Sequence, residues 1–574
     1  MNKRRALSNA FIFVLVFVLL LNATQYPVSA EKYYEKIDSD LLEYMNTVSD
    51  DDLISVSVWL PEVDVSDVEN DVSKKLGYNL SDLNNKDRER IKEFIAEIRK
   101  MNAELYTANN LKYTKTIGKY CQIDYVCKYS NILNCHITKE SIYNLSLLNY
   151  VQKICLNNKA FSDELDISRQ VIHADYVQDT HYDYGFTGDG VSIGVLEPVG
   201  LPDTSLSQFT GANIILDPCA PSNTDHKHAN YIVSIICSQG TSTCARGIAP
   251  DAIVYCTHLQ YNTTLESRMD WLINHNVEII NMSFGDKYSI NTYDSYQDGL
   301  IDKLSKQNHV TVVKSAGNKG MNGVTSPGMA YNAITVGNIN DNNTVQLFDD
   351  NLLESSSYYN TLTPNWASKP DLCAYGTEID VGLDDTPESG TSLSAPHVSG
   401  ALALLIEQEW MLCYSPSVLK AIITAGVHIG SHHFMPSNRV LTTNNSSPAD
   451  SYVQYGAGIL NCLNNANIVA DGHYLFGYFG ANSVGTTTIY LTANKTLRFA
   501  FAYEHDYLAT ALQDINIYLI DSNNQVVASS ETEYNNLEII EYTPTVSGTY
   551  TVISQRNSSS LDAATYIGEA WLQY

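Results

Sequence analysis

Hydrophobic and polar residues follow three different patterns along the chain, and the first covers residues 31–160. Residues 53–60 (LISVSVWL) alternate as in a strand with one buried face. Five apolar residues within a charged stretch recur at helical spacing: Ile91, Phe94, Ile95, Ile98 and Met101. These patterns predict a small α+β unit, in which no chemical site is apparent.

Residues 165–470 carry longer apolar segments. Residues 190–196, 277–282 and 310–313 are rich in β-branched side chains and are typical of strands buried on both faces of a parallel sheet. Helical stretches such as residues 399–408 alternate with them. This alternation predicts an α/β fold, a doubly wound parallel sheet with helices on both faces.

Helical patterns end near residue 473. Residues 496–501 and 515–519 alternate between apolar and polar side chains, residues 521–524 (DSNN) favour a turn, and residues 547–552 begin another strand. The segment 473–574 is therefore predicted to be a β-sandwich.

The first 30 residues are typical of an export signal. Three basic residues at positions 3–5 precede an eleven-residue apolar run, residues 11–21, and the small residues Val28, Ser29 and Ala30 provide a cleavage site. The alternative is a membrane anchor, but spanning a bilayer takes about 20 apolar residues. No later segment has that length, so we expect a secreted, extracellular protein without a stable membrane anchor.

The length of the chain indicates more than one domain, and its net charge argues against some kinds of binding partner. At 574 residues, the chain is too long for one hydrophobic core. It has 35 Lys and Arg against 64 Asp and Glu, a formal net charge of −29. A polyanion of this size has no electrostatic reason to bind nucleic acid or an anionic membrane.

Eleven cysteines occur without a CxxC pattern, which argues against a zinc ribbon or a thioredoxin-type site. Because their number is odd, at least one thiol lacks an intramolecular partner. Cys237 and Cys244 could close a short loop, but buried free thiols explain them equally well.

Residues 389–400 (SGTSLSAPHVSG) contain the clearest chemical signal. Gly390 and Thr391 form a tight turn, Ser392 opens a helix, and Pro396 lies in its first turn, where a missing N–H costs nothing. The N–H of such a serine, together with the helix dipole, can stabilise an oxyanion. Taken alone, this position favours an ordinary helix N-cap, which is the usual role of a serine there.

Three other segments supply partners for this serine. Glu197 ends a buried strand, His228 lies at the start of an apolar helix, and Asn318 follows another buried strand in a glycine-rich turn. His226 competes with His228 for the role of base. A metal site built on the two histidines and an acid is a weaker alternative, since no third ligand follows at a suitable spacing.

Together these segments resemble the subtilisin-like serine proteases (the subtilase superfamily), in which acid, histidine and serine occur in this chain order. The resemblance covers most of residues 165–470 and includes four further segments: 247–250 (GIAP), 280–285 (INMSFG), 326–328 (SPG) and 455–461 (YGAGILN). It implies a serine endopeptidase that cleaves polypeptide substrates through an acyl-enzyme, with no cofactor required.

The resemblance also implies a role for each site residue. Ser392 would be the nucleophile and His228 the base, because the apolar residues 232–236 then match the family's helix. Glu197 would be the acid of the triad. The side-chain amide of Asn318 and the N–H of Ser392 would form the oxyanion hole.

Substrate-binding residues follow from the same resemblance. Ser283, Phe284 and Gly285 would form an exposed strand edge that pairs with the extended substrate backbone. Ala316 and Gly317 would line the side-chain pocket opposite. Acidic loops suit structural calcium, but no EF-hand pattern is present and no metal ligands are predicted.

The flanking units acquire expected roles as well. Residues 31–160 have the place and size of a subtilase propeptide, which would inhibit the enzyme intramolecularly until self-cleavage between Leu156 and Ile167; a stable accessory domain is the alternative. The C-terminal sandwich is similar to pre-peptidase C-terminal domains. We therefore expect a zymogen.

The sequence departs from the family in three places. Glu197 stands where aspartate is usual, Ala229 follows His228 in place of glycine, and Tyr375 interrupts an Ala-Pro-Gly segment. Sedolisins also use glutamate, but they lack the histidine base and replace the oxyanion asparagine with aspartate, whereas this chain has His228 and Asn318. Glu197 alone favours the alternative function, a catalytically silent subtilase fold that binds peptides or serves in adhesion.

Overall fold

The computed structural model describes residues 36–574 with internal gaps. The segments outside the description are 46–47, 50–51, 84–86, 157–168, 180–183, 221–225, 242–243, 260–262, 287–290, 295, 322, 343–346, 348–349, 360–367, 384–386, 429–453, 481–482, 507–511, 533 and 557–564. The predicted signal peptide, residues 1–30, and residues 157–167 of the predicted cleavage segment therefore lie outside the described residues.

A small antiparallel sheet forms the core of the first compact unit, which comprises Met1–Val65 and Asn102–Asn158. In its described part, the strand order is β2-β3-β1-β4, and buried apolar residues such as Val56 and Leu133 pack beneath two helices. The elements are α3 (Ser39–Met45), β1 (Ile54–Trp59), β2 (Gln122–Val126), β3 (Ile132–Ile137), α6 (Lys139–Ser146) and β4 (Lys153–Leu156). The predicted α+β character is confirmed.

Residues Ser66–Met101 belong to the second compact unit rather than the first, which differs from the single unit expected over residues 31–160. They include α4 (Val68–Leu76), η1 (Leu80–Asp82) and the first half of α5 (Arg88–Ile117). The reason is visible at Arg99, which is 2% exposed and donates hydrogen bonds to the backbone carbonyls of Asn308 (3.1 Å) and Val277 (2.9 Å). A buried guanidinium needs such acceptors.

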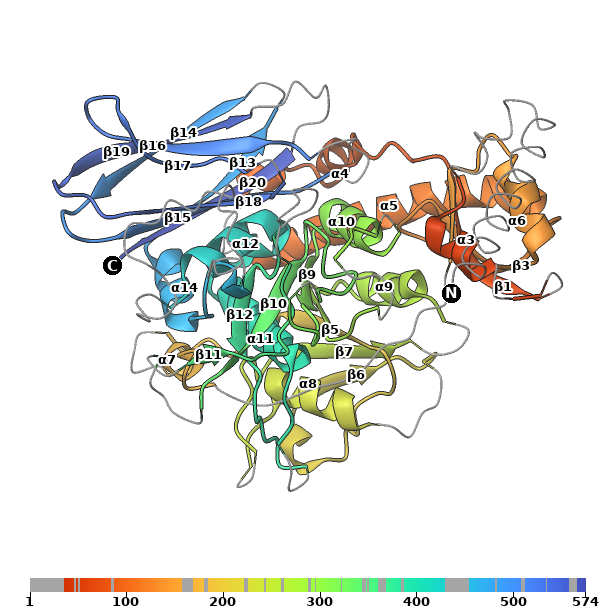
Figure 1. The fold of residues 1–574 in the computed structure, drawn as a ribbon, viewed down its shortest axis with the longest axis horizontal. Helices are drawn as coiled ribbons and strands as arrows, with labels where there is room; N and C mark the ends of the chain where they lie inside the picture. Colours follow the sequence, from red (N-terminus) through yellow and green to blue (C-terminus); the bar gives the residue numbers. More distant parts are fainter. Residues whose placement is uncertain are drawn as a thin grey trace, which may run out of the picture. The chain divides into compact units, whose positions relative to one another are not determined.

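The second unit contains the predicted parallel sheet (Figure 1). Among the described residues, the strand order is β11-β10-β9-β8-β5-β7-β6, with β12 beside β10, and all pairs are parallel except β10 with β11. The strands are β5 (Ser192–Glu197), β6 (Asn213–Leu216), β7 (Ile253–His258), β8 (Ile279–Met282), β9 (Thr311–Ser315), β10 (Ile334–Asn340), β11 (Asn351–Leu352) and β12 (Leu372–Tyr375). The three predicted central strands are thus β5, β8 and β9.

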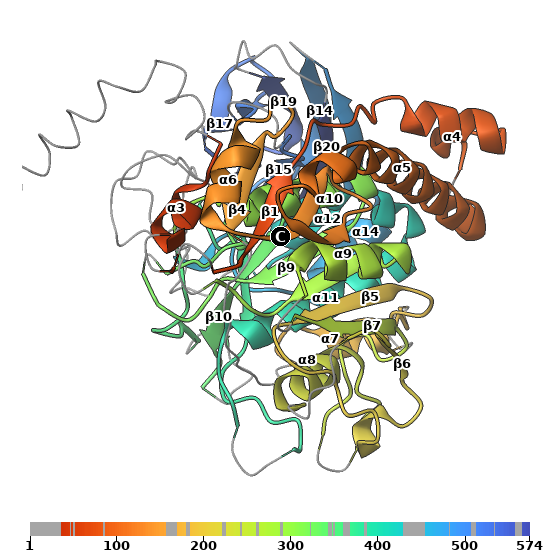
Figure 2. The same cartoon turned by 90° about the vertical axis from the view of Figure 1, so that its right-hand side faces the viewer.

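Helices cover both faces of this sheet, as predicted. Helices α8 and α11 lie on one face and α9 and α10 on the other (Figure 2). The helical elements are α7 (Ala174–Gln178), η4 (Ser207–Phe209), α8 (Lys227–Cys237), α9 (Leu265–Asn274), α10 (Gln297–Asn308), α11 (Thr391–Gln408), η5 (Trp410–Tyr414), α12 (Pro416–Ala425) and α14 (Cys462–Ala470). Every described residue of α11 up to Ile406 is buried, so the serine motif opens a central helix.

The predicted C-terminal β-sandwich is confirmed. Its two antiparallel sheets have the orders β13-β20-β15-β18 and β14-β19-β16-β17 in the described residues, and Phe499, Phe501 and Ile517 lie in the core between them. The strands are β13 (Tyr474–Phe479), β14 (Val484–Leu491), β15 (Leu497–Tyr503), β16 (Ile515–Ile520), β17 (Val526–Ser530), β18 (Leu537–Tyr542), β19 (Gly548–Arg556) and β20 (Thr565–Gln573).

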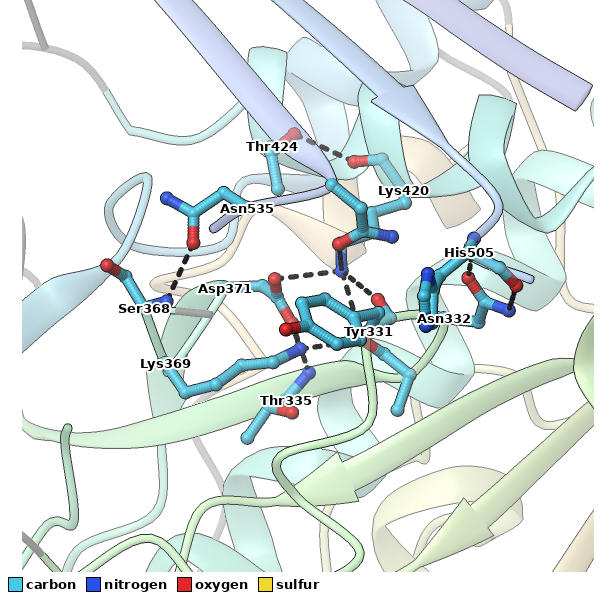
Figure 3. A network of polar contacts seen from close by, with 12 residues as sticks. Tyr331, Asn332, Thr335, Ser368, Lys369, Asp371, Lys420, Thr424, His505 and Asn535 are labelled. Carbon is cyan, nitrogen blue, oxygen red and sulfur yellow. Dashed lines mark hydrogen bonds and ion pairs between the residues drawn. The ribbon is translucent and has the colours of Figure 1, made fainter. Parts of the chain in front are cut away.

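A buried polar network joins the α/β domain to this sandwich (Figure 3). Asp371 accepts from the ammonium groups of Lys369 (2.8 Å) and Lys420 (2.9 Å). Burial raises the pKa of Asp371, but the two lysines outweigh it and leave the pKa below its usual value. Asn332 exchanges two hydrogen bonds with the backbone of His505, at 2.7 and 3.0 Å, across the domain boundary. The sandwich is therefore attached through satisfied buried groups rather than by a linker alone.

Cys237 and Cys244, which could have formed a disulfide, are instead buried free thiols. The Cys244 sulfur lies 3.3 Å from Ser238 Oγ. Within the described part of the chain, none of the helices has the length and apolar character needed to cross a membrane.

Candidate active site

Glu197 and His228 meet at the carboxyl edge of the parallel sheet. Glu197 is the last residue of β5, and His228 is the second residue of α8. The ring Nδ1 of His228 is hydrogen-bonded to Glu197 Oε2, and the two residues are 4% and 1% exposed. Ligands bind at this edge in open α/β sheets, because the loops that follow the strands converge there.

His226 faces a different group. It is the N-cap of α8, and its Nδ1 lies 2.5 Å from the carbonyl oxygen of Leu201. The two candidate bases therefore have different partners. The ring of His228 contacts the carboxylate of Glu197, whereas that of His226 contacts a backbone carbonyl. Among the described residues, no group of three or more His, Cys, Asp or Glu side chains is arranged to hold a metal ion.

Ser392 is the second residue of α11, which packs directly against α8. Its carbonyl oxygen accepts a hydrogen bond from Ser283 Oγ at 2.6 Å. Ser283 in turn accepts from Asn281 Nδ2 (2.9 Å), and Ser399 Oγ donates to Asn281 Oδ1 (3.0 Å). This chain of hydrogen bonds, all between buried residues, holds the start of α11 against the end of β8.

Asn318 is oriented by Thr391, the residue before the serine. Its Oδ1 accepts from the Thr391 N–H (3.0 Å) and from Thr391 Oγ (3.1 Å), and Thr391 Oγ accepts from the Gly317 N–H (3.0 Å). Because the amide oxygen is occupied, the NH₂ of Asn318 is the end that remains to donate. The contacts place that donor beside the N-terminus of α11, where the helix dipole also favours negative charge.

The substrate-binding residues expected from sequence lie where β8 and β9 end. Ser283 and Phe284 follow β8 outside any strand, and their side chains are buried, at 0% and 2% exposed, whereas Gly285 is partly exposed. The Ser283 side chain contacts the carbonyl oxygen of Ser392. Pairing of this segment's backbone with the substrate backbone stays a prediction. Ala316 is buried, and Gly317 has a φ of +113°, a conformation that favours glycine.

Three positioning residues were missed by the sequence analysis: Thr391, Asn281 and Ser399. Thr391 lies inside the serine motif, which drew attention to this segment. Its contact with Asn318 joins residues 73 positions apart, so the motif did not reveal that contact. Asn281 lies in a buried strand and in the segment 280–285 that carries the resemblance, but the sequence analysis assigned it no role. A polar residue in a fully apolar strand is the clue that would have pointed to it.

His397, which also lies in the serine motif, is not a second base. Its ring is fully buried, and Nδ1 is hydrogen-bonded to the carbonyl oxygen of Leu393 at 2.8 Å. Burial lowers the pKa of His397 to about 4. The ring is therefore neutral near pH 7 and serves the packing of α11.

Comparisons with known proteins point to one family. Residues 201–458 match the model of the Subtilase family, Peptidase S8, and the match begins just after Glu197. Subtilisin E of Bacillus subtilis (strain 168) is 25% identical over 240 residues, which cover 39% of this chain and 58% of that protein. Serine protease AprX of the same organism is 26% identical over 338 residues, which cover 52% of this chain and 74% of AprX.

The chain thus spans less than two thirds of the length of subtilisin E. Among solved structures, the self-cleaved protease domain of PatA is similar over 50% of this chain and 99% of that domain, with 22% identity and a TM-score of 0.39.

Proposed function

Since this chain belongs to the subtilase family, we propose that it is a serine endopeptidase that hydrolyses polypeptide substrates through an acyl-enzyme. The observation that carries the proposal is the buried hydrogen bond between Glu197 and His228. A carboxylate on Nδ1 holds the imidazole in the tautomer whose Nε2 can accept a proton. The usual aspartate is replaced here, but the longer side chain still meets the ring.

The proposed reaction uses the groups at the start of α11. Ser392 Oγ attacks the peptide carbonyl carbon as its proton passes to His228 Nε2, and Glu197 stabilises the imidazolium. The carbon–nitrogen bond then breaks, and the leaving amine takes the proton from His228. Water, activated by the same histidine, hydrolyses the ester and restores Ser392.

Negative charge on the tetrahedral intermediate would be met by two donors. One is Asn318 Nδ2, supported by the contacts that occupy its Oδ1, and the other is the backbone N–H of Ser392. Preorganised donors of this kind lower the barrier because they need no reorganisation during the reaction. No cofactor takes part in this scheme.

We further propose that the protein is exported and made as a zymogen. Residues 1–30 would direct secretion, and the N-terminal unit would inhibit the site until the chain is cut within residues 157–167. The support is the sequence pattern of the signal and the position of the unit before the α/β domain.

A fluorophosphonate probe tests the activity directly, since covalent labelling requires an activated serine. We expect the purified full chain to be labelled and Ser392→Ala to be unlabelled. Labelling that is absent in both, while the protein binds peptides, would support the catalytically silent alternative. Mass spectrometry of secreted wild type and Ser392→Ala tests processing, and equal cleavage in both would exclude autolysis.

A further inference from the structure

Thr325 lies between the two segments expected to bind the substrate, residues 283–285 and residues 316–317. Its backbone N–H donates to the carbonyl of Ala316 (3.1 Å). A Cβ built on Gly285 would lie 1.8 Å from Thr325 Oγ, and one built on Gly317 would lie 3.2 Å from it. The hydroxyl therefore lies between two glycines whose missing side chains leave room for it, close to the site of Asn318.

The hydroxyl of Thr325 is a buried polar group that no described residue hydrogen-bonds. Thr325 is 5% exposed, and its Oγ has no hydrogen-bond partner among the described residues. Buried polar groups in native proteins are nearly always satisfied, and each exception calls for an explanation. A substrate group that accepts from this hydroxyl would supply one.

Lys314 brings a positive charge to the same place. It lies at the C-terminal end of β9, opposite Met282 in the β8 register, and is 0% exposed. Its ammonium donates to the carbonyl and the hydroxyl of Ser315, the latter at 3.1 Å. Its Nζ lies 3.5 Å from the Cβ position of Gly285, so it is within about 5.3 Å of Thr325 Oγ, the sum of the two distances.

We infer that this ammonium and this hydroxyl select an acidic substrate residue, aspartate or glutamate, on the amino side of the cleaved bond. The inference rests on the proposed function. The carbonyl that Asn318 receives belongs to that residue, and its side chain would enter next to residues 315–317. Charge-assisted hydrogen bonds from an ammonium to a carboxylate are about twice as strong as neutral ones, and a dry site strengthens them.

Peptide binding to Ser392→Ala tests the inference without requiring catalysis. Uncleaved peptides that differ only at the selected residue, as Asp, Asn, Leu or Lys, would be compared by fluorescence polarisation. We expect Asp to bind at least about tenfold more tightly than Asn, and Lys314→Met in the same background to remove that ratio. Lys319→Met, at an exposed position of the next turn, is the matched control and should keep it.

Hydrolysis by the wild type supplies the second measurement, which holds even if Lys314→Met fails to fold. We expect kcat/KM for the Asp peptide to exceed that for the Asn peptide by at least about tenfold, and Thr325→Val to reduce this ratio. Equal values for Asp and Asn would overturn the inference while leaving the peptidase proposal intact. A preference for the Lys peptide would also overturn the inference. The selecting group would then be the carboxylate of the buried Asp286, which follows Gly285.

If the protein binds the Asp peptide selectively but neither hydrolyses peptides nor reacts with the fluorophosphonate, the acidic preference is supported and the proposed peptidase function is contradicted. The binding and hydrolysis measurements thus separate the two claims.

Discussion

Glu197 Oε2 is hydrogen-bonded to Nδ1 of His228 in a setting where both residues are almost fully buried. The glutamate extends one methylene further than the aspartate usual in this family, yet it reaches the ring from the last position of β5. Its place at the end of a central strand and that of His228 in the first turn of α8 are both set by the sheet and its covering helix. The glutamate therefore makes the contact between carboxylate and imidazole that the proposed triad requires.

Two substitutions of Glu197 distinguish the contribution of its charge to activity from that of its side-chain length. Glu197→Gln keeps the side-chain length but removes the carboxylate, so the wrong tautomer of His228 becomes available, and we expect kcat/KM to fall by about 10³–10⁴-fold. Glu197→Asp keeps the charge but shortens the reach and should cost less. Rates of fluorophosphonate labelling and peptide hydrolysis measure both. Equal activity of Glu197→Gln and the wild type would contradict a triad that includes this residue.

Loss of Asn318, the proposed oxyanion donor, is expected to lower kcat. Asn318→Ala should lower kcat by about 10²–10³-fold with little change in KM, because the donor contacts the oxyanion rather than the ground-state substrate. Peptide hydrolysis under saturating substrate measures this change.

Thr391 offers a finer test of the same group, since it holds the amide of Asn318. Thr391→Ala should lower kcat and leave KM near its original value, and Thr391→Ser, which keeps the hydroxyl, should restore most of the activity. If Thr391→Ser were as slow as Thr391→Ala, the hydroxyl would not be what positions Asn318.

The sandwich is expected to lose stability as the pH rises. Burial raises the pKa of Glu538 to about 8, although hydrogen bonds from Ser530 and Thr532 act in the opposite direction. A carboxyl whose pKa is raised on folding favours the native state most at low pH, and this advantage is lost between about pH 4.5 and 8. Glu538→Gln, which cannot ionise, should gain in Tm relative to the wild type from pH 6 to pH 9.

The control for this prediction is Glu531→Gln, which makes the same chemical change at an exposed position nearby. A Tm difference for Glu538→Gln that is independent of pH would show that Glu538 is ionised in the native state throughout.

Cleavage within residues 157–167 is expected to leave the N-terminal fragment bound. Residues 66–101 lie in the same compact unit as the proposed active site, with Arg99 on two buried carbonyls. The carboxylate of Glu69 also accepts hydrogen bonds from the hydroxyl groups of Tyr414 and Tyr566. The two fragments should therefore co-elute in size-exclusion chromatography and separate only in denaturant.

Arg99→Met tests this contact, because it removes both hydrogen bonds and leaves two buried carbonyls without a donor, at a cost of about 1–3 kcal/mol each. We expect the fragments of Arg99→Met to separate at lower denaturant concentration. Arg90→Met, at a half-exposed position, is the control. Release of the wild-type fragment without denaturant would contradict the prediction.

The sequence determined the fold class, because buried strands and amphipathic helices have periods that are visible in a linear pattern. It also indicated Ser392, His228, Asn318 and Glu197, since these residues stand in segments with a recognisable order. It placed residues 66–101 with the N-terminal unit, because helical periodicity shows that a face is apolar and not which partner covers it.

Tertiary structure alone decided what orients Asn318 and that Lys314 and Thr325 converge beside Gly285. The contact between Asn318 and Thr391 joins residues 73 positions apart. Such contacts are created when strands and helices come together in the sheet, so local sequence carries no direct signal of them. The charge of Lys314 is visible in the sequence, but its role depends on the atoms that the fold brings next to it.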